Sequence, residues 1–551
     1  MKRISQIVLL AAVVGLAGAC GGNKGADTSY LGYDPDAQQL QIGENIAVAK
    51  TTYGTVKGFI YQNVTTFLGI PYGADTGGEN RFMPPKPPKP WDGVLPTVWY
   101  PTSAPQHPYT EGATPYSQFR DRWNYDGFGE DCLKLNVWTP ALDAVKRPVL
   151  VWLHGGGFAA GNGVEQDGYM GANFARRHDA VFVSLNHRLN SFGYSDFAAV
   201  GGEKYKHSGN VGMLDIILAL QWVHDNIAAF GGDPGNVTIM GQSGGGSKVT
   251  IVAAMPAAKG LVHKAVALSG GSTKATDKVY AEELGAQILK TAGLKPSEID
   301  KLQQMPWPEY MALAEKAAAE LRAKQSGDHR YRGFSPVGDD VDIPSGDFYT
   351  SGRDDVPCVP MILSTTTNEF VSDRDNPEQE KLTKADIVKM MEPRYGANSG
   401  AIYDEFDRIF PGNSPFGIYS IVSSSRRNVV QIADNKLQQG QPVYVAWFNW
   451  YPPIFDGLPR AFHCLDISFW FNNTDLMYSH SGGGKQPRML SDKMSDALEA
   501  FMRTGDPNSG KKNALPQWPA YNSEQGPVMI LNDVSRVEND PDRKAREMMP
   551  N

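Results

Sequence analysis

The sequence lacks several features that define other classes of protein. Only four cysteines occur in 551 residues, and none has the spacing of metal ligands, so we expect no structural metal centre. The formal net charge is −8, which argues against a nucleic-acid partner. We find no internal repeat, which excludes solenoid architectures. With 41% hydrophobic and 20% charged residues, the composition is that of a globular protein rather than a disordered one.

Long apolar runs are also missing, apart from one at the N-terminus. Lys2 and Arg3 precede an apolar stretch, Ile4–Leu16, which ends in small residues before Cys20. The stretch is too short to span a membrane comfortably. A basic start, a short apolar run and a small-residue cleavage region predict that residues 1–19 are a secretory signal peptide.

The segment Leu16-Ala-Gly-Ala-Cys20 resembles a bacterial lipobox. The resemblance implies that Cys20 is lipidated and is the first mature residue, which would place the protein in the cell envelope or periplasm, attached to the membrane only through this lipid. The alternative is a secreted protein cleaved near Ala19. Residues 20–46 lack periodic apolar positions and predict a flexible tether, with a single globular catalytic domain over residues 47–551.

The other three cysteines are Cys132, Cys358 and Cys464. If Cys20 carries lipid, they form an odd set, so at most one disulfide can join them. We interpret them as small buried apolar residues.

Short apolar runs predict strands that are buried on both faces, which is typical of a largely parallel sheet. The clearest are Val149–Leu153, Ala180–Leu185, Val237–Met240, Lys264–Leu268 and Val443–Phe448. Helical patterns lie between them, for example Leu214–Phe230. Alternating strands and helices predict an α/β architecture. Residues 273–350 and 370–440 are richer in helix formers, and we interpret them as helical insertions placed to cap a substrate cleft.

The strongest chemical signal is Gly241-Gln242-Ser243-Gly244-Gly245, which stands between a β-branched run and a segment that can start a helix. A Gly-x-Ser-x-Gly pentapeptide in this context is typical of the nucleophile elbow of α/β-hydrolases. The turn must be strained to expose the hydroxyl group, and its flanking positions tolerate only small side chains. Ser243 is therefore the candidate nucleophile.

A second glycine-rich segment, His154-Gly-Gly-Gly157, follows the predicted strand Val149–Leu153. This pattern is typical of the oxyanion loop of esterases, whose N–H groups must approach the substrate's carbonyl oxygen closely. The spacing from Gly155 to Ala160 also fits a loose dinucleotide-binding pattern. That pattern requires an acidic residue at the end of the next strand. The next predicted strand ends at Leu185, without a carboxylate, which argues against the nucleotide hypothesis.

Beyond these two motifs, the sequence resembles the type-B carboxylesterase and cholinesterase family, in its bacterial branch, over nearly the whole predicted mature chain. The matching segments are Gly54–Gly58, Phe67–Tyr72, Arg81-Phe82, Pro90–Gly93, Glu130–Trp138, Phe230–Ser243, Ser491-Asp492 and Thr504–Asn508. The resemblance implies the α/β-hydrolase fold, with a large, mostly parallel central sheet and helical cap insertions.

The resemblance also implies the remaining catalytic residues. Glu369 stands in a segment that matches the position of the family's acid, and His463 stands in a segment that matches that of its base. The order Ser, Glu, His along the chain is the one that α/β-hydrolases use. The oxyanion hole is implied at a further three residues: Gly156, Gly157 and Gly244.

Other residues compete for these roles. Asp466 is an alternative acid, although it stands too close to His463 along the chain to favour triad geometry. His154 is interpreted as part of the loop scaffold, and His187 stands where relatives often have Tyr. The resemblance further implies two structural ion pairs: Arg81 with Glu130, and Arg188 with Asp215.

Three positions depart from the family pattern. Gln242 replaces a Glu that most relatives carry, which removes a negative charge beside the nucleophile and argues against a preference for cationic substrates. Gly244 replaces the usual Ala. Cys132 lacks the upstream cysteine with which relatives form a disulfide.

The sequence therefore predicts a serine carboxylic-ester hydrolase that acts on a small-molecule ester through an acyl-enzyme intermediate. This chemistry requires no metal ion and no organic cofactor. Two alternatives stay open: the same triad acting on an amide, carbamate or lactone, and a non-catalytic binding or adhesion member of the fold.

Overall fold

The computed structural model describes residues 39–108, 124, 127–324, 333–350, 353–369, 377–424, 426–512 and 514–550. Residues 1–38, with the predicted signal peptide, Cys20 and most of the predicted tether, lie outside the described residues. The chain joins the main sheet at Gln41, whose N–H and carbonyl groups pair with Ile60, each at 2.9 Å.

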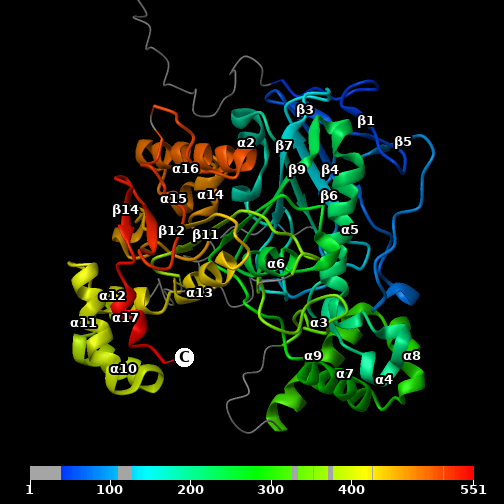
Figure 1. Ribbon diagram of the computed structural model, residues 1–551. Coiled ribbons are helices and arrows are strands. Elements are labelled where there is room, and N and C mark those ends of the chain that lie inside the picture. The colour runs from blue at the N-terminus through cyan, green and yellow to red at the C-terminus, as the bar shows by residue number, and fades with distance from the viewer. Residues whose placement is uncertain are drawn as a thin grey trace, which may run out of the picture.

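An eleven-stranded sheet forms the centre of the molecule, with a smaller three-stranded sheet beside its N-terminal strands (Figure 1). From edge to edge, the strands of the large sheet are β14 (Arg536–Asn539), β13 (Pro527–Leu531), β12 (Val443–Phe448), β11 (Met361–Thr366), β10 (Lys264–Leu268), β9 (Gly232–Gln242), β7 (Arg147–Leu153), β8 (Val181–Leu185), β6 (Lys134–Thr139), β4 (Val64–Pro71) and β3 (Phe59–Tyr61). The small sheet consists of β1 (Val48–Lys50), β2 (Thr55–Lys57) and β5 (Val94–Pro96).

Parallel pairing runs without interruption from β13 to β8, and the antiparallel pairs lie at the two edges of the sheet. All five strands predicted from the sequence are present, and β9 extends beyond its predicted range at both ends. The large, mostly parallel sheet is thus confirmed. Its central strands β7, β8, β11 and β12 are buried along their whole length, which explains why they read as continuous apolar runs.

Side chains of successive strand residues enter two separate hydrophobic cores. In β7, Val149 and Val151 pack on one face, while Leu150 and Trp152 pack on the other. The first face is covered by α5 (Val211–Asn226), α6 (Gly244–Val252) and α13 (Arg426–Leu437). The second is covered by α2 (Ala172–His178), α14 (Ile467–Trp470) and α16 (Lys485–Thr504).

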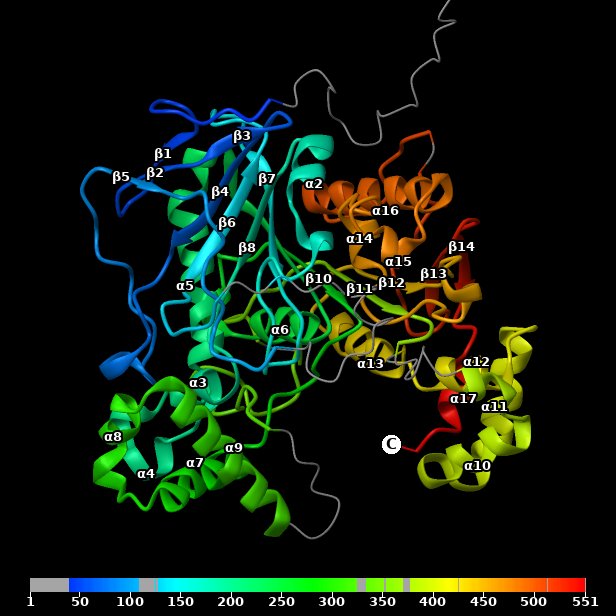
Figure 2. The same ribbon diagram turned by 180° about the vertical axis from the view of Figure 1, so that it is seen from behind.

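The two predicted insertions are helical in the described residues. The first contains α7 (Lys278–Ala292), α8 (Ile299–Gln304) and α9 (Trp307–Lys324), and the second contains α10 (Lys384–Tyr395), α11 (Ser399–Ile409), α12 (Pro415–Val422) and α13. Helix α7 begins where the Asp277 side chain accepts hydrogen bonds from two backbone N–H groups, and it ends at Gly293. Helices α7–α9 and α10–α12 form two groups on opposite sides of the molecule, below α6 (Figures 1 and 2).

The remaining α-helices in the described residues are short: α3 (Asn190–Tyr194), α4 (Ala198–Gly201), α15 (Tyr478–Ser481) and α17 (Arg543–Glu547). Within the described ranges, no helix is both long enough and apolar enough to cross a membrane.

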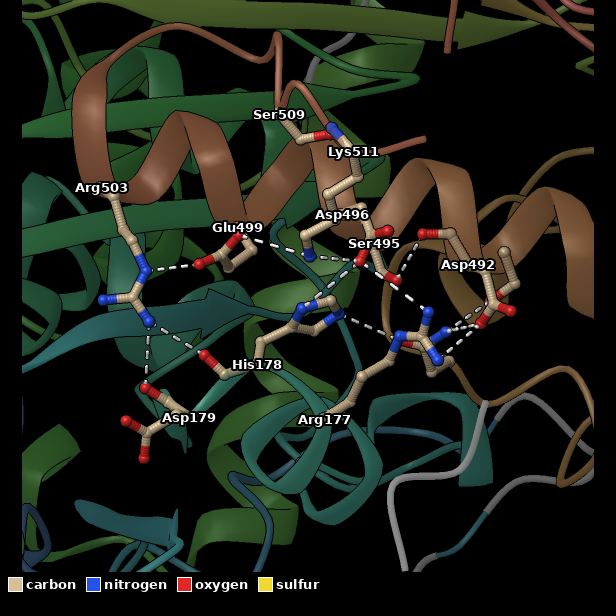
Figure 3. A network of polar contacts seen from close by, with 12 residues as sticks. Arg177, His178, Asp179, Asp492, Ser495, Asp496, Glu499, Arg503, Ser509 and Lys511 are labelled. Atoms are coloured by element: carbon tan, nitrogen blue, oxygen red, sulfur yellow. Dashed lines mark hydrogen bonds and ion pairs between the residues drawn. The ribbon is translucent and has the colours of Figure 1, made fainter. Parts of the chain in front are cut away.

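A polar network fastens helix α16 to α2 (Figure 3). The guanidinium group of Arg177 lies 3.0 Å from a carboxylate oxygen of Asp492 and 3.8 Å from one of Asp496. From α16, Arg503 donates to the backbone carbonyl of His178 at 3.0 Å. Burial, followed by the charge of Arg177, lowers the pKa of His178 well below its ordinary value. His178 is therefore neutral at physiological pH and acts as a buried part of this junction.

Both ion pairs implied by the family resemblance are present. Arg81 contacts both carboxylate oxygens of Glu130, at 2.7 and 2.6 Å. Arg188 contacts both oxygens of Asp215, at 2.8 and 2.6 Å, and its backbone N–H donates to the same carboxylate at 2.9 Å. The Arg188 and Asp215 side chains are only 1% and 0% exposed. Removing one partner would leave the other charge buried without its counter-ion.

Asp215→Ala should therefore lower the free energy of unfolding by about 3–5 kcal/mol, the usual effect of breaking a buried pair. Denaturant unfolding followed by fluorescence measures this change. Asp225→Ala, near the exposed end of the same helix, is the control and should change stability by less than about 0.5 kcal/mol. Equal stability of the two variants would show that the pair does not support the fold.

Candidate active site

Ser243 stands in a tight turn between β9 and α6, as the strand–turn–helix pattern predicts. Its backbone has φ 59° and ψ −123°, a region that residues with a side chain rarely occupy. The N–H of Ser243 donates to the carbonyl of Leu268 at 2.8 Å, which ties the turn to the end of β10. Because Ser243 is the N-cap residue of α6, the positive end of the helix dipole lies at the serine and favours negative charge there.

Two glycines of the pentapeptide are required by close packing. A Cβ atom at Gly241 would lie 2.4 Å from the carbonyl oxygen of Gly245, and one at Gly245 would lie 2.0 Å from that of Leu153. Both distances are far shorter than real carbon–oxygen contacts. The strained turn can therefore form only with glycine at these positions, which explains the Gly-x-Ser-x-Gly pattern physically.

Parallel pairing brings Glu369 and His463 together. Strands β11 and β12 are neighbours, and the chain segments that follow them pair again where Asn368 bridges Phe462. Directly beyond this bridge, the N–H of His463 donates to the carbonyl of Glu369 at 3.0 Å. The backbone thus holds the two residues side by side although they are far apart in the sequence.

The side chains of these residues are joined as well. Nδ1 of His463 lies 2.5 Å from Oε2 of Glu369, and the N–H of Thr366 donates to Oε1 at 2.8 Å. The Thr365 hydroxyl group also contacts Oε1. Burial alone would raise the pKa of Glu369, but the charge of His463 and these hydrogen bonds outweigh it and lower the pKa. Glu369 is therefore an ionised partner that orients the imidazole.

The pKa of the His463 imidazole shifts in the opposite direction to that of Glu369. Burial alone would lower the pKa of His463, but interactions with Cys464 and Glu369 raise it well above its ordinary value. The Glu369 carboxylate contacts Nδ1 of the ring directly, so we regard it as the main source of this shift. The imidazole is thus more basic than a free histidine side chain, which suits a proton acceptor.

Gln242 lies beside the His463 imidazole and also contacts Cys464. The sequence did not predict these contacts. Nε2 of Gln242 lies 3.3 Å from each ring nitrogen of His463. The Cys464 thiol donates to Oε1 of the same Gln242 side chain at 3.2 Å. Gln242 directly precedes Ser243, so this contact brings the imidazole beside the nucleophile elbow. The only signal in the sequence was that each residue adjoins a candidate catalytic residue.

The glycine-rich loop after β7 packs against the elbow. A Cβ atom at Gly155 would lie 3.5 Å from Cβ of Ser243, and one at Gly244 would lie 2.1 Å from the carbonyl oxygen of Gly157. Gly156 and Gly157 both have positive φ, at 80° and 61°. The three candidate oxyanion residues therefore lie in two segments in direct contact, and this arrangement leaves no room for a Cβ atom at position 244.

The competing residues take other positions. Asp466 is fully buried and accepts a hydrogen bond from Nε1 of Trp470 at 3.3 Å, whereas Glu369 contacts the imidazole. Burial, and then the charge of Glu369, raises the pKa of Asp466 to about 7. His154 and His187 are buried and stacked on each other, with ring centroids 4.9 Å apart. This placement agrees with the scaffold role predicted for His154.

Cys132, Cys358 and Cys464 are all free. Cys132 is buried as predicted, but Cys358 is exposed and Cys464 is half-buried, so the prediction of burial is wrong for these two. Cys358 lies in the surface loop before β11, and Cys464 contacts the polar side chain of Gln242. In the part of the chain that the structure describes, no group of three His, Cys, Asp or Glu side chains is arranged to hold a metal ion.

The fold and this site define an α/β-hydrolase with a serine nucleophile elbow. The family model described as the Carboxylesterase family matches residues 45–400 and 417–548. The chain belongs to this family and is a carboxylesterase.

Individual relatives match along nearly their whole length. The chain is 31% identical to the para-nitrobenzyl esterase of Bacillus subtilis over 510 residues, covering 91% of this chain and 98% of that protein. It is 30% identical to a phenmedipham hydrolase of Pseudarthrobacter oxydans, covering 88% and 95%. Among solved structures, an esterase of Clostridium hathewayi, described as hydrolysing aliphatic aromatic polyesters, superimposes with a TM-score of 0.79 at 31% identity, covering 93% of this chain and 99% of that one.

The contact between Gln242 and His463 leads to a pH prediction. Gln242→Glu places a carboxylate beside the imidazole, which should raise the pKa of His463 further. If His463 acts as the base, the acid limb of kcat/KM for ester hydrolysis should move upward by about one pH unit.

A pH–rate profile from about pH 5 to 9 measures this shift. Gln242→Met removes the amide group without adding charge, so its acid limb should stay close to that of the unaltered protein. An acid limb that is the same in the Glu and Met variants would contradict an interaction between residue 242 and the catalytic base.

Proposed function

We propose that this carboxylesterase uses a Ser243–His463–Glu369 triad and an acyl-enzyme intermediate. In the first step, His463 takes the proton of the Ser243 hydroxyl group as its oxygen attacks the ester carbonyl, and the protonated imidazole then gives the proton to the departing alcohol. In the second step, water attacks the acyl group with the same assistance. The 2.5 Å contact between His463 and Glu369 is the single observation that best supports this assignment.

The proposed oxyanion hole consists of the N–H groups of Gly156, Gly157 and Gly244. Support comes from the direct packing of Gly157 on Gly244 and from the position of Gly244 as the first residue of α6. Donors fixed in this way stabilise charge that develops on the substrate oxygen only in the transition state. The mechanism needs acid–base chemistry from this chain alone.

Esters are the substrate class that the relatives favour, because the para-nitrobenzyl esterase and the polyester-hydrolysing enzyme are both esterases by name. For the choice among esters, the neutral side chain of Gln242 is the relevant feature. Without a carboxylate at this position, we expect uncharged esters to be preferred over esters of cationic alcohols.

Ser243→Ala should reduce hydrolysis of a p-nitrophenyl ester by about 10⁴-fold or more, because both chemical steps use this hydroxyl group. Release of p-nitrophenol measures the rate. Ser247→Ala, one turn further along α6, is the matched control and should retain activity. An organophosphate should label the unaltered protein at Ser243, as judged by intact mass and peptide mapping. Substantial activity in Ser243→Ala would refute the nucleophile assignment.

We further propose that the protein is exported and anchored by a lipid on Cys20. The basic start, the apolar run Ile4–Leu16 and the lipobox-like end of that segment support this proposal. Secretion after cleavage near Ala19 is the alternative. Bacterial cells grown with radiolabelled palmitate should incorporate label into the protein but not into Cys20→Ser. Label in that variant, or none in the unaltered protein, would contradict lipid attachment.

A further inference from the structure

Lys248 is a buried charged residue that the proposed mechanism does not use. It stands on α6, five residues after Ser243, and is 0% exposed. Its Nζ donates to the backbone carbonyl of His154 at 2.9 Å and lies 3.4 Å from that of Gly155. Lys248 thus connects the helix that begins at the nucleophile with the loop that carries the candidate oxyanion donors.

The surroundings of Lys248 make its burial costly. Nζ lies 5.9 Å from the centre of the Phe158 ring, and among the described residues Lys248 forms no ion pair. Buried lysines are rare unless paired, because an ammonium group loses its hydration. The two carbonyl contacts compensate only part of this loss. A hydrophobic side chain would fill the same space with less strain on the folded state.

The partners of Nζ suggest what Lys248 does. The carbonyl of Gly155 belongs to the same peptide group as the N–H of Gly156, which is a proposed oxyanion donor. A cation at the oxygen of a peptide group polarises it and strengthens the N–H as a donor. The same contacts fix the direction of the carbonyl groups, and therefore that of the N–H groups on the other side of each peptide plane.

We propose that Lys248 is a positioning residue for the oxyanion hole: its ammonium group holds and polarises the His154 and Gly155 carbonyls, so that the loop presents its N–H groups to the ester oxygen. This inference rests on the proposed function, because it presupposes an oxyanion at Gly156. It assigns Lys248 an effect on the transition state rather than on substrate binding.

Charge makes this role dependent on pH. Burial lowers the pKa of Lys248 to about 7, and the charge of Glu165 opposes this shift. The other titratable groups nearby are His154 and His187, and burial together with the charge of Lys248 lowers the pKa of both well below the ordinary value. They are therefore neutral at physiological pH. As pH rises through the pKa of Lys248, its ammonium group loses its proton. Since His154 and His187 are neutral, Lys248 is the one of these three residues that carries a positive charge beside the glycine loop, so kcat should fall.

The test compares Lys248→Met with Lys436→Met. Lys436 is a matched control because it is also a fully buried helical lysine, whose pKa burial lowers to about 8. Lys436 lies near Cys358, which precedes β11. Glu369 follows β11, so Lys436 and the candidate site lie at opposite ends of this strand. Lys248→Met should lower kcat by about 10- to 100-fold, less than the full loss of an oxyanion donor, with KM nearly unchanged. Lys436→Met should change neither.

The pH profile of kcat provides a readout that a purely structural role would not move. The unaltered protein and Lys436→Met should lose activity on the alkaline side, whereas Lys248→Met should lack this limb. Lys248→Gln, which keeps a donor but no charge, is the second variant if the Met variant does not fold. It should also lack the limb, with a smaller loss of kcat.

Organophosphate labelling of Ser243 distinguishes a failure of the proposed function from a failure of the role proposed for Lys248. If Ser243 is not labelled in the unaltered protein, the proposed function fails. If Ser243 is labelled but the Met and Gln variants keep the kcat and the alkaline limb of the unaltered protein, the role of Lys248 is overturned and the proposed function stands.

Discussion

The parallel pairing of neighbouring strands is the constraint on which the site depends. Parallel strands all end at the same edge of a sheet, so the segments that follow them meet there. Ser243 directly follows β9, the glycine loop follows β7, and Glu369 follows β11. The pairing continues beyond the strands where Asn368 bridges Phe462, and this fixes Glu369 beside His463 through the backbone itself. Side-chain hydrogen bonds then refine a position that strand register has already set.

Several buried charged residues lie near this edge, and they are stabilised in different ways. Arg188 and Asp215 face each other through paired hydrogen bonds, so each buried charge has a counter-ion beside it. Glu369 keeps its charge through His463 and the neighbouring threonines. Lys248 has only backbone carbonyls as hydrogen-bonding partners in the described residues. A charge that contributes so little to stability is better explained by the reaction than by the fold, since natural active sites commonly sacrifice stability for function.

Sequence reasoning predicted the parts of this structure that local chemistry determines. Central strands read as apolar runs because both of their faces are buried, and the elbow was visible because its turn tolerates only glycine at Gly241 and Gly245. The partnership of Glu369 with His463 came from family resemblance, because spacing along the chain carries no information about which strands are neighbours. The contact between Gln242 and Cys464, and the exposure of Cys358, depend on tertiary packing that has no periodic signal.

Gln242, one of the departures from the family pattern, and the buried Lys248 act in the same electrostatic direction. A glutamate at position 242 would place a second carboxylate beside His463, where it would stabilise the imidazolium form. It would also compete with Glu369 for hydrogen bonds from the ring nitrogens. Gln242 contacts the same ring without this charge. On the other side of the nucleophile, Lys248 adds positive charge behind the glycine loop. The site is therefore more positive overall than one with a glutamate at position 242, and this favours a reaction whose transition state places negative charge on the substrate oxygen.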